Sequence, residues 1–262
     1  MTIDLADYEK GRPFDGDYDA ELASLQRRLA HIQVAYLVHR QRAIIVFEGW
    51  DAGGKGGAIQ RLTTEWDPRQ FQVWPIAAPT AEELSHHFLW RFWRALPGDG
   101  QIAVFDRSWY GRVLVERVEG LIDEPHWRRA YDEINAFERM QHEDKATIVK
   151  MFLHVTLNEQ ERRLKDRLKH PWKRWKTGLD DYRNRARRPA YMAAIKDMLA
   201  QTDTHWAPWH VIDGNEKLSA RIAVLRHVAD RLESAVSMDP PPPDPAVMEA
   251  ARLAFGDEAA KD

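Results

Sequence analysis

The chain has 262 residues, of which 44% are apolar, and a formal net charge of −3. A chain of this length can bury a large core, and the absence of cysteine excludes disulfides, thiolate zinc sites and cysteine nucleophiles. No apolar run approaches the ~20 residues of a membrane-spanning helix, and the acidic N-terminus lacks the features of a signal peptide. We therefore expect a cytoplasmic protein without a membrane partner.

Helix and strand patterns alternate along the chain after an irregular arm at 1–17. Apolar spacings of three and four, together with capping signals such as Thr80 and Glu83, predict the helices, and short apolar runs predict the strands. The predicted helices cover 20–39, 54–66, 80–95, 109–118, 125–142, 159–169, 179–200 and 216–232. The predicted strands cover 43–47, 71–76, 102–105, 147–155 and 209–212. This alternation predicts an α/β fold, a three-layer sandwich around a five-stranded parallel sheet.

A glycine-rich turn joins the first predicted strand to the helix that follows it. Gly49, Gly54 and Lys55 have the spacing of a phosphate-binding P-loop, in which backbone N–H groups and a helix N-terminus surround phosphate oxygens. The alternative is a tight turn in which the glycines only permit the backbone conformation, but such a turn would not require the lysine. We expect Lys55 to contact the transferred phosphoryl group. The predicted phosphate-binding residues of the loop are Gly49, Gly53, Gly54, Lys55, Gly56 and Gly57.

Two acidic residues are candidate metal ligands. Gly56 stands where P-loop kinases usually carry a Ser or Thr that holds Mg²⁺, and Asp51 within the loop is the substitute ligand. The strand at 102–105 ends in Asp106, which is the Walker B arrangement, although an Asp in this place can also cap a helix. Taken together, Asp51 and Asp106 predict a site for Mg²⁺, or for Mn²⁺ in its place.

Three arginines follow the second acidic residue at intervals of five. Arg107 lies at the strand end, where a phosphate would bind, and Arg112 and Arg117 lie in the next predicted helix. We predict that all three bind phosphate and that Arg107 and Arg112 act in catalysis. The alternative for the latter two is ordinary surface charge, such as a pair of Arg112 with Glu116 four residues on.

A strongly basic segment covers 161–188, with twelve Lys or Arg against four Asp or Glu. A solvated helix face is the usual meaning of such a run, but Pro171 and the interleaved tryptophans favour a mobile lid that closes over phosphates. Interleaved aromatic and basic residues would also suit single-stranded nucleic acid. The predicted lid residues that contact the nucleotide are Lys173, Arg174, Lys176 and Arg183.

The chain resembles the polyphosphate kinase 2 family over about 18–232, on the motifs at 47–57, 77–80 and 105–118. The resemblance implies a P-loop kinase fold with a helical lid and Mg²⁺-dependent phosphoryl transfer between inorganic polyphosphate and a nucleoside mono- or diphosphate. It also implies purine nucleotides as substrates and a homo-oligomer, with a tetramer favoured. The motif at 111–114 is more similar to members that phosphorylate AMP, or both AMP and ADP. The family's functional positions match Asp51, Lys55, Asp106, Arg107, Arg112, Arg117, Lys173, Arg174 and Lys176.

Two other functions remain open from the residues. One is an ATP-dependent nucleoside monophosphate kinase, against which Gly56 argues. The other is a polyanion or nucleic-acid binding module built on 161–188, in which the glycine-rich loop and the strand that ends in Asp106 would have no role. Because of those motifs we do not expect a nucleic-acid partner. The predicted organisation is an arm at 1–17, a kinase domain at 18–236 whose basic lid covers about 160–190, and a proline-rich tail at 237–262.

Overall fold

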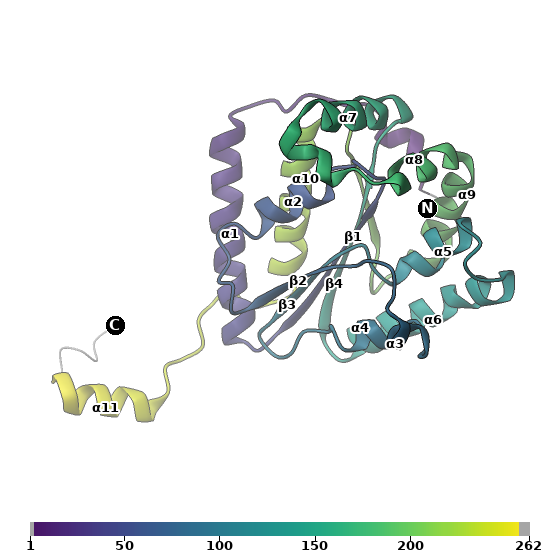
Figure 1. The fold of residues 1–262 in the computed structure, drawn as a ribbon. Coiled ribbons are helices and arrows are strands. Elements are labelled where there is room, and N and C mark those ends of the chain that lie inside the picture. Colours follow the sequence, from purple (N-terminus) through teal and green to yellow (C-terminus); the bar gives the residue numbers. More distant parts are fainter. Residues whose placement is uncertain (1–2, 257–262) are drawn as a thin grey trace.

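The computed structural model describes residues 3–256. At its centre is a parallel sheet with the strand order β2-β3-β1-β4-β5 (Figure 1). The strands are β1 (Arg42–Gly49), β2 (Phe71–Pro75), β3 (Ile102–Asp106), β4 (Ala146–His154) and β5 (Trp209–Asp213). The central strand β1 is buried from Ala43 to Glu48, as expected for a nearly continuous apolar strand that helices cover on both faces. The predicted α/β class and five-stranded parallel sheet are confirmed.

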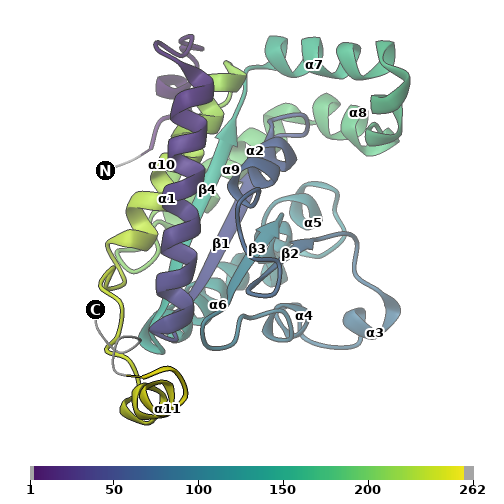
Figure 2. The same ribbon diagram turned by 90° about the vertical axis from the view of Figure 1, so that its left-hand side faces the viewer.

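Helices form a layer on each face of the sheet. One face packs against α1 (Tyr18–Val38), α2 (Lys55–Leu62) and α10 (Lys217–Glu233) through one apolar cluster. The other face packs against α6 (Glu124–Glu143) and α9 (Arg188–Thr202) through a second cluster. Figure 2 shows α1 and α10 side by side along one side of the sheet. The sandwich therefore has three layers, and its two cores are separated by the sheet.

The predicted lid forms a separate helical segment near α2. It consists of α7 (Leu157–Lys169), a 3-10 turn at Pro171–Lys176, and α8 (Leu179–Ala186). In both ribbon views α7 and α8 lie close together at the end of the molecule where the glycine-rich loop enters α2 (Figures 1 and 2). Pro189 lies in the first turn of α9, where its missing N–H costs nothing, so the predicted helix at 179–200 is divided there.

Two predicted helices are broken into shorter pieces. The capping box of Thr80 and Glu83 is present, but the helix predicted to 95 becomes α3 (Ala81–Leu84) and α4 (Trp90–Trp93). Ser85 Oγ donates to the carbonyl of Glu82, and His86 Nδ1 contacts the same oxygen, so side chains occupy the acceptor that the next helical turn would use. Residues 109–118 likewise form a 3-10 turn (Trp109–Arg112) followed by α5 (Val115–Val118).

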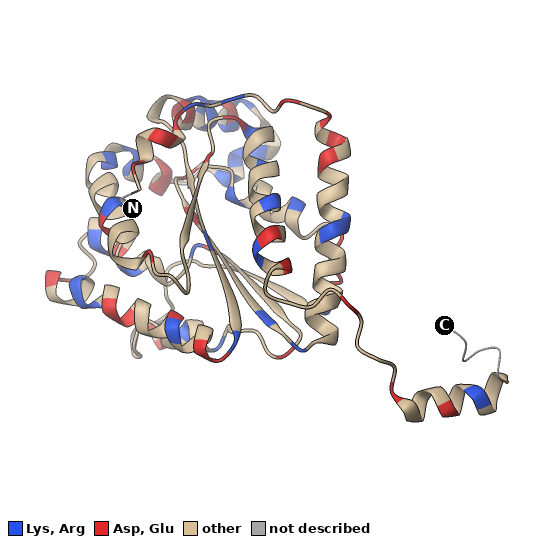
Figure 3. Cartoon of the chain, turned by 180° about the vertical axis from the view of Figure 1, so that it is seen from behind, with Lys and Arg blue, Asp and Glu red and all other residues tan. Residues whose placement is uncertain are grey.

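The two ends of the described chain differ in their contacts. The arm is not free, because Leu5 in a 3-10 turn (Leu5–Tyr8) is buried, and Gly11 N donates to Asp213 Oδ2 over 2.7 Å. By contrast, α11 (Pro245–Phe255) has no buried residue and stands apart from the body in Figure 3. Residues 1–2 of the predicted arm and 257–262 of the predicted tail lie outside the described part.

No helix within residues 3–256 has the length and apolar character that crossing a membrane requires.

Candidate active site

The glycine-rich loop runs so close to β4 that one of its glycines cannot be replaced. Gly49 has φ +138°, and a Cβ built there would lie 2.4 Å from the carbonyl oxygen of Leu153. Gly54, at the N-cap of α2, also has a positive φ, of +110°. Gly56 is different, because a Cβ there would meet nothing within 4 Å. The backbone geometry therefore explains Gly49 and Gly54, whereas packing does not explain the missing hydroxyl at Gly56.

Lys55 is the first residue of α2 and is buried beside the loop. Its Nζ donates to the carbonyls of Gly49, over 2.9 Å, and of Trp50, over 3.2 Å. Burial, followed by the positive charge of Arg107, lowers the pKa of Lys55. The ammonium group thus stands inside the loop, where an incoming phosphate would find a poorly solvated cation.

The two predicted metal ligands lie at the same edge of the sheet, Asp51 just after β1 and Asp106 at the end of β3. β1 and β3 pair directly, with Phe47 opposite Asp106, and Asp51 and Asp106 line one cavity together with Lys55. Within residues 3–256, no hydrogen bond or ion pair engages the carboxylate of Asp106, and no group of three or more His, Cys, Asp or Glu forms a ready metal cluster. Mg²⁺ commonly takes one or two protein carboxylates and completes its shell with phosphates and water, so this donor set fits that ion.

Asp51 is held in place by two donors. One carboxylate oxygen pairs with the guanidinium of Arg107, and the other accepts a hydrogen bond from Asn184 Nδ2 over 2.8 Å. Burial raises the pKa of Asp51, but the charges of Arg107 and Lys55 and the hydrogen bond from Asn184 outweigh it, so the pKa lies below its usual value. Asp51 is therefore ionised at neutral pH and oriented by a residue of the lid helix α8.

A cavity of about 770 Å³ opens beside the loop and is mostly basic. The loop and the end of β3 form one wall, the lid forms the second, and the start of α10 forms the third. Five Asp also line it, so the basic residues outnumber the acidic ones by eight to five. A cavity of this size and charge suits a ligand with several phosphates. Its basic residues are Lys55, Arg107, Arg163, Arg167, Lys173, Lys176, Lys217 and Arg221.

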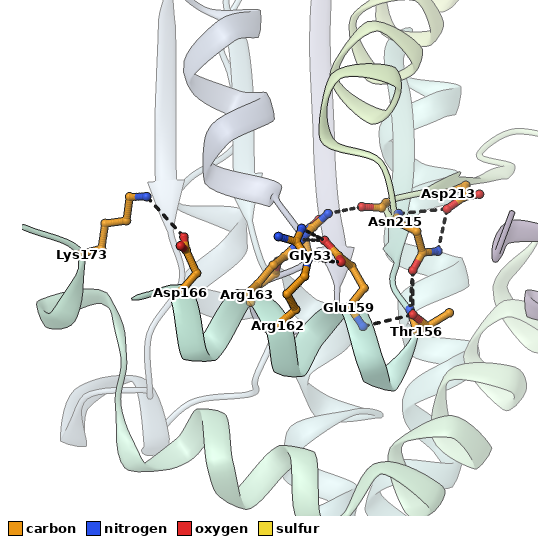
Figure 4. Close-up of polar contacts among 11 residues, drawn as sticks. Gly53, Thr156, Glu159, Arg162, Arg163, Asp166, Lys173, Asp213 and Asn215 are labelled. Carbon is orange, nitrogen blue, oxygen red and sulfur yellow. Dashed lines mark hydrogen bonds and ion pairs between the residues drawn. The ribbon is translucent and has the colours of Figure 1, made fainter. Parts of the chain in front are cut away.

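Arg163 clamps the backbone of the loop from α7. Its side chain is only 5% exposed, and Nη1 donates to the carbonyls of Ala52 and Gly53, over 3.1 Å each. Nη2 donates to the carbonyl of Gly214, and Nε pairs with Glu159 over 2.6 Å (Figure 4). The basic composition of 161–188 indicated this helix, but not this role. Lys217 and Arg221 were also missed, although their spacing of four places them on one face of α10.

Two of the predicted arginines are not brought to the cavity. Arg112 pairs with Glu116 over 2.5 Å, as in the alternative given above for this arginine, and it also stacks on the ring of Phe88. Arg117 pairs with Asp197 over 2.8 Å and also donates to a tyrosine hydroxyl and stacks on a tryptophan. Both guanidinium groups are paired with acidic side chains and stacked on aromatic rings, so we leave both arginines out of the site proposed below.

Of the four predicted lid cations, two line the cavity and two do not. Lys173 and Lys176 line the cavity, together with Trp175. Arg174 instead donates to the carbonyl of Leu168 over 2.7 Å, and Arg183 pairs with acidic residues of α8 and of the segment after α5. The structure therefore places half of the four predicted lid residues beside the loop.

Comparisons with known proteins identify relatives of this chain. A profile of the polyphosphate kinase 2 family matches residues 14–240. The chain is 47% identical over 85% of its length to a polyphosphate:AMP phosphotransferase of Pseudomonas syringae pv. tomato, of which it covers 45%. It is 35% identical to an AMP/ADP-polyphosphate phosphotransferase of Meiothermus ruber, with 87% of each chain covered.

A solved structure supports the same assignment. The crystal structure of polyphosphate kinase 2 from Arthrobacter aurescens superposes with a TM-score of 0.87 at 35% identity, covering 96% of this chain and 93% of that one. The chain spans about half the length of the polyphosphate:AMP phosphotransferases that it matches. The sequence match and the shared fold together show that this chain belongs to the polyphosphate kinase 2 family.

Proposed function

We propose that the chain transfers a phosphoryl group between inorganic polyphosphate and a purine nucleoside mono- or diphosphate, such as AMP or ADP. The observation that carries this proposal is the basic cavity, in which Asp51, Lys55 and Asp106 face cations from the lid and from α10. Those additional cations extend the phosphate site beyond the loop, as a polymeric phosphate would require. The names of the relatives in Pseudomonas syringae and Meiothermus ruber support the same pair of substrates.

Each proposed residue has a role that follows from its position. The N–H groups of the loop would bind phosphate oxygens, and Lys55 and Arg107 would stabilise charge on the transferred group. The acceptor is a phosphate oxygen that is already anionic, so the site needs no strong general base. Lys173 and Lys176 in the lid would contact the phosphates and help to exclude water.

We propose Asp51 and Asp106 as the residues that would hold Mg²⁺, with Mn²⁺ as a substitute. When bound, the ion would supply neutralisation of charge on the phosphate oxygens. The carboxylate of Asp106 is available for this, and that of Asp51 would become so if Arg107 turned towards a phosphate.

One set of incubations tests the proposal. The pure protein is mixed with Mg²⁺, polyphosphate and each of AMP, ADP, GMP and GDP, and the products are separated by chromatography. We expect polyphosphate-dependent formation of the next higher nucleotide. Turnover of AMP with ATP, but not with polyphosphate, would refute the proposal in favour of a monophosphate kinase, and salt-sensitive oligonucleotide binding without turnover would favour a binding module.

Two variants test the site itself. Lys55→Ala and Asp51→Asn are each expected to lower kcat by at least about 100-fold, since the first removes a cation that stabilises the transferred group and the second weakens the proposed metal site. Lys196→Ala, an exposed lysine of α9, is the control and should be unchanged. Circular dichroism checks that the variants are folded. Retained turnover in Lys55→Ala or Asp51→Asn would remove that residue from the mechanism.

We also propose a homo-oligomer, with a tetramer as the expected form. Exposed apolar side chains on α1, such as Val34 and Val38, would be covered in an assembly. Light scattering of the pure protein measures the mass directly, and a monomer would refute this part of the proposal.

A further inference from the structure

The side chain of Trp50 anchors the loop to the body of the protein. It is only 5% exposed, and its indole Nε1 donates to Nδ1 of His154 over 3.0 Å. The guanidinium of Arg188, from α9, lies 3.9 Å from the centre of the indole ring. On the backbone, the carbonyl of Trp50 accepts from the N–H of Gly53 over 2.9 Å and from Lys55 Nζ. A shift of Trp50 would therefore move the backbone that is to bind phosphate.

His154, the last residue of β4, connects this anchor to the N-terminal arm. Its side chain is completely buried, and its Nε2 lies 2.9 Å from Oε1 of Glu9. An indole N–H can only donate, so Nδ1 of His154 must be the acceptor and the ring proton must sit on Nε2, where it donates to Glu9. The hydrogen-bond chain thus assigns a single neutral tautomer to a buried histidine.

The charges around the ring are consistent with a neutral imidazole. Burial lowers the pKa of His154; Glu9 and Asp213 act in the opposite direction, and Arg188 adds to the lowering. A doubly protonated ring would carry a proton on both nitrogens and could no longer accept from Trp50. Glu9 comes from the arm, Asp213 from β5 and Arg188 from α9, so three separate elements converge on the ring.

We propose that Glu9 and His154 are positioning residues of the phosphate-binding loop: Glu9 accepts from the Nε2–H of His154 and fixes the ring, whose Nδ1 holds Trp50 and with it the backbone up to Lys55. The arm is thereby part of the active-site framework, although it does not line the basic cavity. This inference rests on the proposed phosphoryl transfer for its effect on turnover, while the hydrogen-bond chain can be tested without any activity.

The test compares three variants of the arm. Glu9→Ala removes the acceptor, Glu9→Gln keeps an acceptor oxygen without the charge, and Asp7→Ala removes an exposed carboxylate from the same arm as a matched control. Polyphosphate-dependent kinetics give kcat and KM, and thermal unfolding gives the stability. Loss of one well-formed hydrogen bond corresponds to roughly a tenfold effect, so we expect kcat of Glu9→Ala to fall by about that factor. Glu9→Gln should recover most of the loss, and Asp7→Ala should match the wild type.

Two measurements that do not depend on activity complete the test. NMR of ¹⁵N-labelled histidine should show Nε2-protonated His154 in the wild type and in each of Glu9→Ala and Trp50→Phe, because the remaining partner still fixes the proton, and a mixture of tautomers in the double variant. Amides of 50–55 should exchange faster with solvent in Glu9→Ala than in Asp7→Ala. Wild-type kcat together with unchanged exchange of the amides of 50–55 in Glu9→Ala would overturn the inference. An inactive wild-type protein would instead refute the proposed function, and the spectra and exchange rates would still decide whether Glu9 holds the loop.

Discussion

Arg163 offers the sharpest test of how the loop is supported. Replacing it by Met removes a buried guanidinium that donates to three backbone carbonyls and pairs with Glu159. Removing one partner from a buried, hydrogen-bonded ion pair costs about 3–5 kcal/mol, because the groups left behind lose their partners. For a chain of this size that corresponds to a fall in Tm of about 5–9 °C. Arg163→Lys keeps the charge but not the planar fork, so we expect about half of the loss.

Arg162 supplies the matched control for this experiment. It is adjacent in sequence and pairs with the same Glu159, but its side chain is 62% exposed and it does not contact the loop. Arg162→Met should therefore cost less than about 1 kcal/mol. Scanning calorimetry measures Tm for all three variants, and KM for polyphosphate should rise in Arg163→Met, less in Arg163→Lys, and not in Arg162→Met. The reasoning is refuted if Arg163→Met unfolds within the experimental error of Arg162→Met.

Three further outcomes can be measured by unfolding. Gly49→Ala should give little folded protein, because its Cβ would lie 2.4 Å from the carbonyl oxygen of Leu153; a normal melting curve would contradict this. Gly56→Ala should instead raise the free energy of unfolding by about 0.5–1 kcal/mol, since the site is open and helical, and a loss would show an unrecognised constraint there. Burial, followed by the charge of His210, lowers the pKa of His227 to about 4, and the two rings stack 3.7 Å apart. The unfolded state binds this proton first as pH falls, so stability is complete above about pH 6.5 and decreases towards pH 4, by on the order of 2–3 kcal/mol for this group. The free energy of unfolding in urea should differ less between pH 7 and pH 5 for His227→Gln than for the wild type. Equal differences would exclude this contribution of His227.

The local sequence was a good guide where a pattern was long and self-contained. The apolar run of β1, the glycines after it and Lys55 predicted a strand, a tight loop and a helix start, and all three are present. Prediction was poorer at 80–95 and 109–118, where apolar and helix-forming residues suggested single helices. At 80–95 the side chains of Ser85 and His86 bond to the carbonyl of Glu82 and end the helix early, and this competition has no periodic signature in the sequence.

Sequence-based prediction also succeeded for only some residues of the candidate site. Asp51, Lys55, Asp106 and Arg107 were predicted from motifs, and the structure gathers them beside one cavity because β1 and β3 are neighbours. Arg112 and Arg117 were predicted from their spacing and from the resemblance of the motif at 105–118, and the structure does not bring them to the cavity. Arg117 turned out to pair with Asp197, a residue eighty positions further on, which no local pattern could show.

The sequence by itself predicted the elements and the chemistry proposed for this protein: the alternation of strands and helices, a glycine-rich loop without the usual hydroxyl at Gly56, and two acidic residues, one in that loop and one at a strand end. The tertiary structure alone decided which distant cations share the cavity, that Arg163 clamps the loop, and that Glu9 reaches Trp50 through His154. The physical reason is the distance along the chain over which each kind of interaction acts. Backbone propensity and periodicity act over a few residues, whereas burial and charge pairing depend on contacts that exist only after the sheet has brought remote segments together.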